Sequence, residues 1–298
     1  VYSGATPDFV DINKKTYTID PNLVEEKVKY YKSKGLNVKA IIGVDFAGHP
    51  CDWKALRSIA DRYELQLIND NCHAMGASYF DDKKYAVKYA DVVTHSYHPV
   101  KQITAGEGGA ILTNSKKIDE KFKIYRTHGM EKDSNSSKNS EPWYYEMHEL
   151  GYNYRLTDFQ CALGSSQLRK LDQFIIERNK IANYYSKIFK ENLLIKIPKV
   201  SEEIKHAFHL YPLLVDFSQL KIRKSLFFLK LESKNIKLQV HYIPVHLQPF
   251  YKKNYGFKDS DFPIAKKFYQ DEISIPIYPS LTEKNQNLFI STFLKYLK

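Results

Sequence analysis

The first half of the chain alternates short runs of β-branched and apolar residues with segments whose apolar positions recur at helical spacing. The apolar runs cover residues 38–46, 65–70 and 91–97, and a helical pattern fills residues 52–63. Parallel strands need a long crossover connection, usually a helix, between them. The alternation therefore predicts an α/β architecture with a mainly parallel sheet.

Three helix starts are marked by side chains that can accept a hydrogen bond from the free backbone N–H groups of a first turn. Asp20 stands directly before a proline, and Asp52 and Ser115 each precede a helical pattern. Oxygen-bearing side chains are favoured at this capping position, and proline is favoured just after it. We therefore expect helices to begin at these three points.

A longer helical pattern covers residues 157–190, and we expect it to bridge two domains. The predicted boundary separates a large domain, residues 1–176, from a small C-terminal one, residues 177–298. The apolar stripe of the bridging helix consists of Phe159, Ala162, Leu163, Leu168, Leu171 and Ile175.

Beyond this helix the pattern changes to a mixture of strands and helices. Residues 207–217 and 237–243 are predicted strands, and residues 222–234 and 283–298 are predicted helices. Such a mixture is typical of a small α+β domain.

Two further segments have their own patterns. Residues 2–12 are predicted to form a strand already inside a domain, so we expect the chain to begin partway through its large domain. Residues 131–142 are polar, rich in Ser and Asn and without periodicity, which predicts an exposed loop.

Composition narrows the class of protein. A chain of 298 residues, 43% of them hydrophobic, can bury a substantial core. It contains no apolar run of bilayer length and no secretory signal pattern, which favours a cytoplasmic protein without a membrane partner. Its three cysteines, Cys51, Cys72 and Cys161, form no C-x-x-C pair. We expect free thiols, with neither disulfides nor a metal site.

The net charge of +11 suits an anionic partner, which includes nucleic acid, a phosphorylated cofactor and a nucleotide substrate. Much of the excess lies in residues 116–123 and 180–190, where lysines are mixed with acidic residues and asparagines as on a solvated helix face. A nucleic-acid binder would rest on net charge alone, because no nucleic-acid-binding motif is present.

A carboxylate ends the second predicted strand. Asp70 follows Leu67, Ile68 and Asn69, and His73 comes three residues later. Ligands of open α/β sheets gather at the carboxyl ends of strands, so Asp70 is placed to hold a cofactor. Taken alone, Asp70 is equally consistent with a cap on the next turn, and a single histidine is more often structural.

A lysine follows the next predicted strand in the same way. Lys101 comes just after the strand that ends near Ser96, and three glycines, Gly106, Gly108 and Gly109, follow it. Burial lowers the pKa of a lysine and yields a free amine able to attack an aldehyde. The glycines permit a sharp turn, although a hairpin would also use them.

Together these residues fit pyridoxal phosphate (PLP), which needs a Schiff-base lysine, a carboxylate for the ring nitrogen and donors for the phosphate. Here the chain resembles the DegT/DnrJ/EryC1/StrS sugar aminotransferases over nearly its whole length. The resemblance is carried by Asn-Asp-Asn-Cys-His-Ala-Met-Gly at 69–76, by Ser-Tyr-His-Pro-Val-Lys at 96–101 with Glu-Gly-Gly at 107–109, and by Gly-Tyr-Asn-Tyr-Arg-Leu-Thr-Asp at 151–158. It implies the fold-type I architecture of PLP-dependent transferases, with a mainly parallel large-domain sheet and a smaller α+β C-terminal domain.

The resemblance also implies roles for individual residues. Lys101 would form the Schiff base and act as general base, and Asp70 would pair with the pyridinium nitrogen. Ser96 would bind the phosphate, and His73 would lie against the ring or its phenolic oxygen. Asn153 would reach the phosphate of the neighbouring subunit's cofactor, which implies a homodimer with shared active sites.

From the residues alone, the stretch 153–158 also fits a loop with Thr157 as a helix cap.

The substrate class follows from further similarity. Residues 45–51, 239–251 and 275–280 are similar to the branch of the family that serves pseudaminic acid biosynthesis. That branch moves an amino group from glutamate to C4 of a UDP-linked 4-keto-6-deoxy-N-acetylhexosamine. A lysine rather than a histidine at position 101 favours amino transfer over sugar dehydration.

Three residues are candidates for the sugar-nucleotide site, and they are His241, Tyr242 and His246. A strand with buried aromatic residues accounts for them equally well.

Two departures from the family pattern keep alternatives open. Asn69 stands where the family usually has glutamate, and the family's N-terminal Gly-Thr-Ala turn, which grips the phosphate, has no counterpart. The alternatives are a truncated, non-catalytic remnant of such an enzyme and a transaminase for another nucleotide-linked 4-keto sugar.

Overall fold

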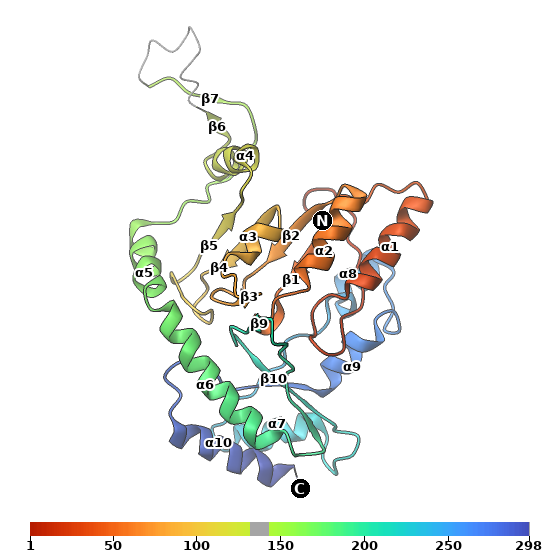
Figure 1. Cartoon of the computed structure of the whole chain (residues 1–298), viewed down its shortest axis with the longest axis vertical. Helices are drawn as coiled ribbons and strands as arrows, with labels where there is room; N and C mark the ends of the chain where they lie inside the picture. Colours follow the sequence, from red (N-terminus) through yellow and green to blue (C-terminus); the bar gives the residue numbers. More distant parts are fainter. Residues whose placement is uncertain (132–142, 298) are drawn as a thin grey trace.

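The computed structural model describes residues 1–131 and 143–297 (Figure 1). Its main sheet has the strand order β1-β2-β4-β5. The strands β1 (Ala40–Val44), β2 (Gln66–Asp70) and β4 (Val92–Ser96) are parallel, and β5 (Gly109–Leu112) is antiparallel to β4. The predicted parallel sheet is therefore confirmed for its first three strands.

The helices α2 and α3 lie between the parallel strands, α1 precedes β1 and α4 follows β5, and the predicted caps are confirmed. The helices are α1 (Pro21–Ser33), α2 (Trp53–Tyr63), α3 (Tyr85–Tyr89) and α4 (Lys116–Arg126). The side chains of Asp20, Asp52 and Ser115 accept hydrogen bonds from backbone N–H groups at the starts of α1, α2 and α4. The sequence thus places these helix starts because each cap satisfies a backbone donor that the helix leaves free.

The helix α2 packs tightly on β1. Trp53 and Leu56 are wholly buried, and Ile59 and Ala60 continue the same face. A Cβ atom at Gly43 of β1 would lie 2.8 Å from the Trp53 ring, so only glycine leaves room for that indole.

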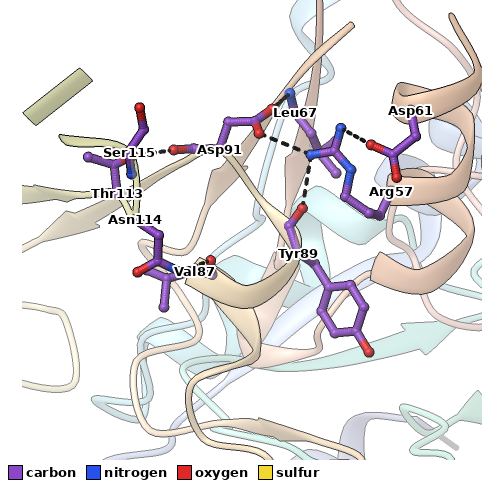
Figure 2. Close-up of polar contacts among 9 residues, drawn as sticks. All are labelled: Arg57, Asp61, Leu67, Val87, Tyr89, Asp91, Thr113, Asn114 and Ser115. Atoms are coloured by element: carbon purple, nitrogen blue, oxygen red, sulfur yellow. Dashed lines mark hydrogen bonds and ion pairs between the residues drawn. The ribbon is translucent and has the colours of Figure 1, made fainter. Parts of the chain in front are cut away.

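At the amino ends of the strands, polar contacts join β2 to β4 (Figure 2). The Asp91 carboxylate accepts from the Leu67 backbone N–H at 2.7 Å and from the Arg57 guanidinium at 3.1 Å. The Thr113 hydroxyl donates to the Asp91 carbonyl at 2.7 Å. These bonds fix the register of the strands, and so they also fix where the opposite ends of the strands lie.

A second, antiparallel sheet has the strand order β11-β10-β8. Its strands are β8 (Ile195–Lys196), β10 (Tyr211–Val215) and β11 (Glu272–Ile275). The helices from residue 171 onward are α6 (Leu171–Phe189), α7 (Lys224–Glu232), α8 (Pro249–Tyr255), α9 (Pro263–Asp271) and α10 (Glu283–Tyr296). Two short 3-10 turns are η1 (Phe46–Gly48), directly after β1, and η2 (Val245–Leu247), directly before α8.

Buried apolar side chains form two clusters. One surrounds the main sheet and includes Trp53, Leu67 and Val93, whereas the other lies between α6, α10 and β10 and includes Tyr185 and Phe293. The division into domains at residues 176 and 177 stays a prediction.

Two predicted strands are wrong. Residues 2–12 form no strand, and only Ile12 makes a β-bridge. The Asp11 carboxylate instead caps α9, accepting from the N–H groups of Ile264 and Ala265 at 2.8 Å each. Residues 237–243 form only the single bridge Gln239–Ser274, because the backbone N–H of His241 bonds to a glutamate side chain rather than to a neighbouring strand.

The predicted bridging helix is two helices. α5 (Asp158–Leu168) and α6 are separated at Arg169 and Lys170, where the Lys170 N–H bonds to the Gln167 carbonyl, three residues back. Thr157 caps α5 as predicted, in a capping box with Gln160.

Two short two-stranded pairings lie outside the two larger sheets. β3 (Ser78–Tyr79) pairs with β9 (Ile204–Lys205), and β6 (Met130–Glu131) pairs with β7 (Glu146–Met147), which projects away from both sheets (Figure 1). The predicted loop at 131–142 lies, except for Glu131, outside the described residues. Among the helices that are described, none has the continuous apolar length of a bilayer-crossing segment.

Candidate active site

The candidate site lies at the carboxyl ends of the parallel strands. Asp70 is the last residue of β2, Ser96 is the last residue of β4, and Lys101 follows shortly after. Because β2 and β4 are adjacent and parallel, both chain segments leave the sheet at the same edge. This is the arrangement that the sequence predicts for Asp70 and Lys101.

Lys101 has the electrostatic surroundings of a reactive amine. Its side chain is half-buried, and burial lowers its pKa, while the neighbouring Cys72 thiol and Asp70 carboxylate act in the opposite direction. The Asp70 carboxylate is therefore close enough to Lys101 to act on its amine. A lowered pKa increases the fraction of neutral amine, which is the nucleophilic form.

His73 is held as a neutral imidazole with a defined proton position. The Ala47 backbone N–H donates to its Nδ1 atom at 3.3 Å, so Nδ1 is bare and Nε2 carries the proton. The Nε2 atom lies 3.3 Å from the Tyr242 hydroxyl oxygen, which accepts a hydrogen bond from the Nε2–H group. Burial lowers the pKa of His73 to about 3, and the nearby charge of Lys101 adds to the effect.

Tyr242 and His241 reach the same cluster from the other part of the chain. The Tyr242 and His73 rings lie 6.2 Å apart, and the His241 and Tyr242 rings 4.7 Å apart. The charge of Lys101 also contributes to the lowered pKa of His241, after burial. The structure thus brings together five predicted residues, Asp70, His73, Lys101, His241 and Tyr242.

Two members of the cluster are missing from the sequence prediction. The His209 ring lies 4.4 Å from the His73 ring, and the buried Gln102 amide donates to the His73 carbonyl. Gln102 is adjacent to Lys101 and could have been suspected on that ground. His209 carries no local signal, because it lies beside His73 only through the contact of residues 206–210 with η1.

That contact depends on a glycine. Gly48 has φ of +103°, and a Cβ atom there would lie 2.8 Å from the Phe208 backbone nitrogen. The Gly48 carbonyl accepts from the Ala207 N–H at 2.9 Å, and the Ala47 carbonyl accepts from the Leu210 N–H at 3.2 Å. The segment that carries His209 is therefore fastened to the turn that orients His73.

A buried carboxylate, Asp45, organises the same turn. It accepts hydrogen bonds from five donors: Cys51 N (2.7 Å), Trp53 Nε1 (2.9 Å), Asn69 Nδ2 (3.1 Å), Asn71 Nδ2 (2.7 Å) and the Tyr85 hydroxyl (2.7 Å). Burial raises the pKa of Asp45 to about 6 and the donated bonds oppose that rise, so the group is ionised at neutral pH.

Asp45 also gives a physical reason for the departure at position 69. Asn69 is wholly buried, and its amide donates to Asp45. A glutamate there would place a second carboxylate against the first, and like charges this close and this buried are strongly unfavourable. The asparagine supplies a donor instead.

Three other predicted residues lie elsewhere or make separate contacts. The Ser96 hydroxyl accepts from the His98 N–H at 3.3 Å. Asn153 is exposed and forms a β-bridge with Thr127. His246 is buried against Phe262, with ring centroids 4.7 Å apart, and no contact found among the described residues joins it to His73 or Lys101. Their predicted roles stay predictions.

Comparison with known proteins identifies the family. The model of the DegT/DnrJ/EryC1/StrS aminotransferase family matches residues 1–293. The chain belongs to this aminotransferase family.

Relatives of this aminotransferase include proteins of named activity. It is 41% identical over 284 residues to an uncharacterized Methanocaldococcus jannaschii protein, MJ1066, covering 95% of this chain and 72% of that one. It is 36% identical over 297 residues to the UDP-4-amino-4,6-dideoxy-N-acetyl-β-L-altrosamine transaminase of Campylobacter jejuni, covering 99% and 74%. The structure of Helicobacter pylori PseC, an aminotransferase of pseudaminic acid biosynthesis, aligns with a TM-score of 0.86 at 30% identity, covering 99% and 75%.

These findings confirm the predicted fold class and cofactor. Aminotransferases of this family depend on PLP, and a solved Streptococcus pneumoniae relative, Spr1654, with 26% identity and a TM-score of 0.85 over 99% of this chain and 76% of its own, is in a PLP form. The side chains present here fit that cofactor, because an amine of lowered pKa and a carboxylate share one strand-end site. The aminotransferase is thus a sugar aminotransferase by family.

Proposed function

We propose that this aminotransferase moves an amino group from glutamate to C4 of a UDP-linked 4-keto-6-deoxy-N-acetylhexosamine. The observation that carries the amino transfer is the half-buried Lys101 amine of lowered pKa beside Asp70. The substrate class is supported by the Campylobacter jejuni relative, which is named as a transaminase of a UDP-linked amino-dideoxy-N-acetyl sugar and is 36% identical to this chain.

Each residue of the candidate site would have its own role in binding the cofactor and moving protons. Asp70 would hold the cofactor's ring nitrogen, and Lys101 would hold the cofactor and move a proton at its Nζ atom. When bound, PLP supplies an electron sink for the carbon that gains or loses the amino group. His73, fixed in its neutral form, would offer a flat face, and Tyr242, whose oxygen accepts from His73, keeps its own hydroxyl proton free to donate.

We further propose that the working form is a homodimer with shared sites. The helix α5 buries none of its residues in this chain, and its apolar side chains Phe159 and Leu163 are 90% and 42% exposed. Exposed apolar side chains continue along the chain before it, at Trp143, Tyr145, Met147, Leu150, Tyr152 and Tyr154. Exposed apolar side chains in such number favour an interaction site, and Asn153 lies among them in the sequence.

The experiment that tests the function is amino transfer from glutamate to a panel of UDP-, dTDP- and GDP-linked 4-keto sugars, read by mass spectrometry. The UDP-linked N-acetylated sugar should be converted fastest. Amination of only a dTDP- or GDP-linked sugar would contradict the substrate class and leave the amino transfer intact.

Lys101→Ala and Lys101→Arg test the assignment of the amine. Both variants should lose amino transfer by several orders of magnitude, because neither side chain can act as a neutral primary amine. Borohydride reduction followed by peptide mapping should find the PLP mass on Lys101 in the wild type only. The exposed Lys230→Ala serves as matched control, and retention of activity in Lys101→Ala would remove the assignment.

A further inference from the structure

A buried glutamate lies behind His241. Glu272, the first residue of β11, is wholly buried. One of its oxygens accepts from the His241 backbone N–H at 2.9 Å, and the other accepts from the Ser274 hydroxyl at 2.5 Å. The Ser274 oxygen lies 2.8 Å from His241 Nδ1. The three side chains therefore form one hydrogen-bonded chain, Glu272–Ser274–His241.

The single hydroxyl proton of Ser274 couples the two ends of this chain. While Glu272 is ionised, the hydroxyl donates to it, so Ser274 can only accept from His241, and Nδ1 must carry the proton. The His241 Nε2 atom is then bare. If Glu272 is protonated, it can donate to Ser274, whose own proton turns toward Nδ1, and the imidazole proton moves to Nε2. The charge of Glu272 thus selects the tautomer of His241.

The free end of His241 belongs to the candidate site. Its ring contacts the Tyr242 ring, and the charge of Lys101 acts on it. No hydrogen bond to its Nε2 atom is found within residues 1–131 and 143–297. Nε2 is therefore the one ring nitrogen of His241 that is open to a ligand.

Few charged groups face Glu272. Burial raises its pKa to about 7, while the Ser274 hydroxyl, the His241 N–H and the ammonium of Lys224 from α7 oppose that rise. On the other side, Glu272 contributes to the raised pKa of Tyr242. The carboxyl group is therefore ionised in mildly alkaline solution.

We propose that Glu272 and Ser274 are positioning residues that present His241 Nε2 to the substrate as a hydrogen-bond acceptor. The proposed aminotransferase function enters only in naming the donor, a hydroxyl or ammonium group of the sugar. The bare Nε2 atom favours a ligand that donates at this position and disfavours one that offers only acceptors.

Glu272→Gln gives a sharp test because its amide has one allowed orientation. The amide oxygen must face the His241 backbone N–H, since two donors cannot face each other, so the NH₂ group faces Ser274. Ser274 then accepts from the amide and donates to His241 Nδ1. The variant should hold His241 in the opposite tautomer, with the proton on Nε2.

The readout is the ¹⁵N NMR spectrum of the holoenzyme labelled at histidine, with the His241 signals assigned by their loss in His241→Asn. Above the Glu272 pKa of about 7, the wild type should show a protonated Nδ1 and a bare Nε2. Glu272→Gln should show the reverse, and Ser274→Thr, which keeps a hydroxyl, should match the wild type. The exposed Glu191→Gln is the matched control.

The kinetic expectation is a KM effect. Glu272→Gln should raise the KM for the keto sugar by about five- to tenfold with kcat little changed, because one substrate hydrogen bond is lost. An unchanged tautomer in Glu272→Gln overturns the proposal, and a changed tautomer with an unchanged KM overturns the contact with substrate. If Glu272→Gln changes the tautomer but the wild-type enzyme aminates no sugar on the panel, the proposed function is refuted and the coupling of Glu272 to His241 stands.

If Glu272→Gln does not fold, Ser274→Ala decides the matter. This variant breaks the chain, so the His241 tautomer should no longer respond to pH near the Glu272 pKa. A response as large as in the wild type would overturn the coupling.

Discussion

At the scale of single residues, the proton positions in the site follow from backbone geometry. Ala47 has φ of +58°, and its N–H donates to His73. The backbone therefore decides which nitrogen of His73 is protonated, and burial keeps the ring neutral. The cost of that neutrality shows in the dependence of stability on pH.

We expect His73 to destabilise the fold in acid. Its folded pKa, about 3, lies below its ordinary value of 6.5. Between these values the unfolded chain binds a proton that the folded chain does not, so the free energy of unfolding falls as the pH is lowered, by up to about 1.4 kcal/mol per pH unit for one proton.

The test compares urea unfolding of wild type and His73→Asn at a series of pH values below 6.5. Asn Oδ1 can replace Nδ1 as acceptor for the Ala47 N–H but does not titrate. The variant should therefore lose stability less steeply in acid. Equal slopes would contradict the assignment, and the exposed His148→Asn is the control for removal of one imidazole.

At the scale of elements, one side chain, Asp52, fixes the start of α2. Asp52 accepts from the Ala55 N–H at 3.1 Å, and the Tyr79 hydroxyl donates to it at 3.1 Å. The cap therefore serves the helix α2 and also joins it to β3. Because α2 packs on β1 through Trp53, the cap also supports the turn that follows β1.

Replacing Asp52 by alanine should lower the free energy of unfolding by about 1 to 2 kcal/mol, through loss of the cap and of the Tyr79 bond. Asp52→Asn keeps the acceptor oxygen and should cost only a small part of this. Chemical denaturation of both variants measures the difference, and equal losses in the two would show that the cap contributes little.

These elements also show what sequence alone can provide. Caps, strand ends and the strand-end pair Asp70 and Lys101 are local or topological features, so pattern and connectivity are enough to find them. His209 and Glu272 could not be found this way, because they reach the cluster only through tertiary contacts with η1 and with the 237–243 segment. The strand predicted at residues 2–12 does not form, because apolar character alone does not provide a partner strand and the Asp11 side chain caps α9 instead.

At the scale of the whole molecule, the exposed face of α5 sets the expected assembly. The helix has an apolar stripe, yet none of its residues is buried within the chain. A second copy covering this face would bury Phe159 and Leu163 and would bring Asn153 toward another subunit's site.

Phe159→Glu should therefore convert a dimer into monomers and abolish amino transfer, because it places a charge in the apolar contact. Sedimentation velocity and the transaminase assay measure the two effects. The matched control, Leu288→Glu on α10, also replaces an exposed apolar side chain and should change neither. A Phe159→Glu variant that stays dimeric would show that α5 is not the contact.

Because five groups donate hydrogen bonds to Asp45, the residues around it can be replaced by those of a relative only together. Asn69, Asn71 and Tyr85 each donate a hydrogen bond to the Asp45 carboxylate. A change in any one of these four residues therefore alters the surroundings of the other three. Substitutions at these positions should be strongly non-additive. A chimera that imports the second strand from a glutamate-bearing relative would have to import its counterpart of Asp45 as well.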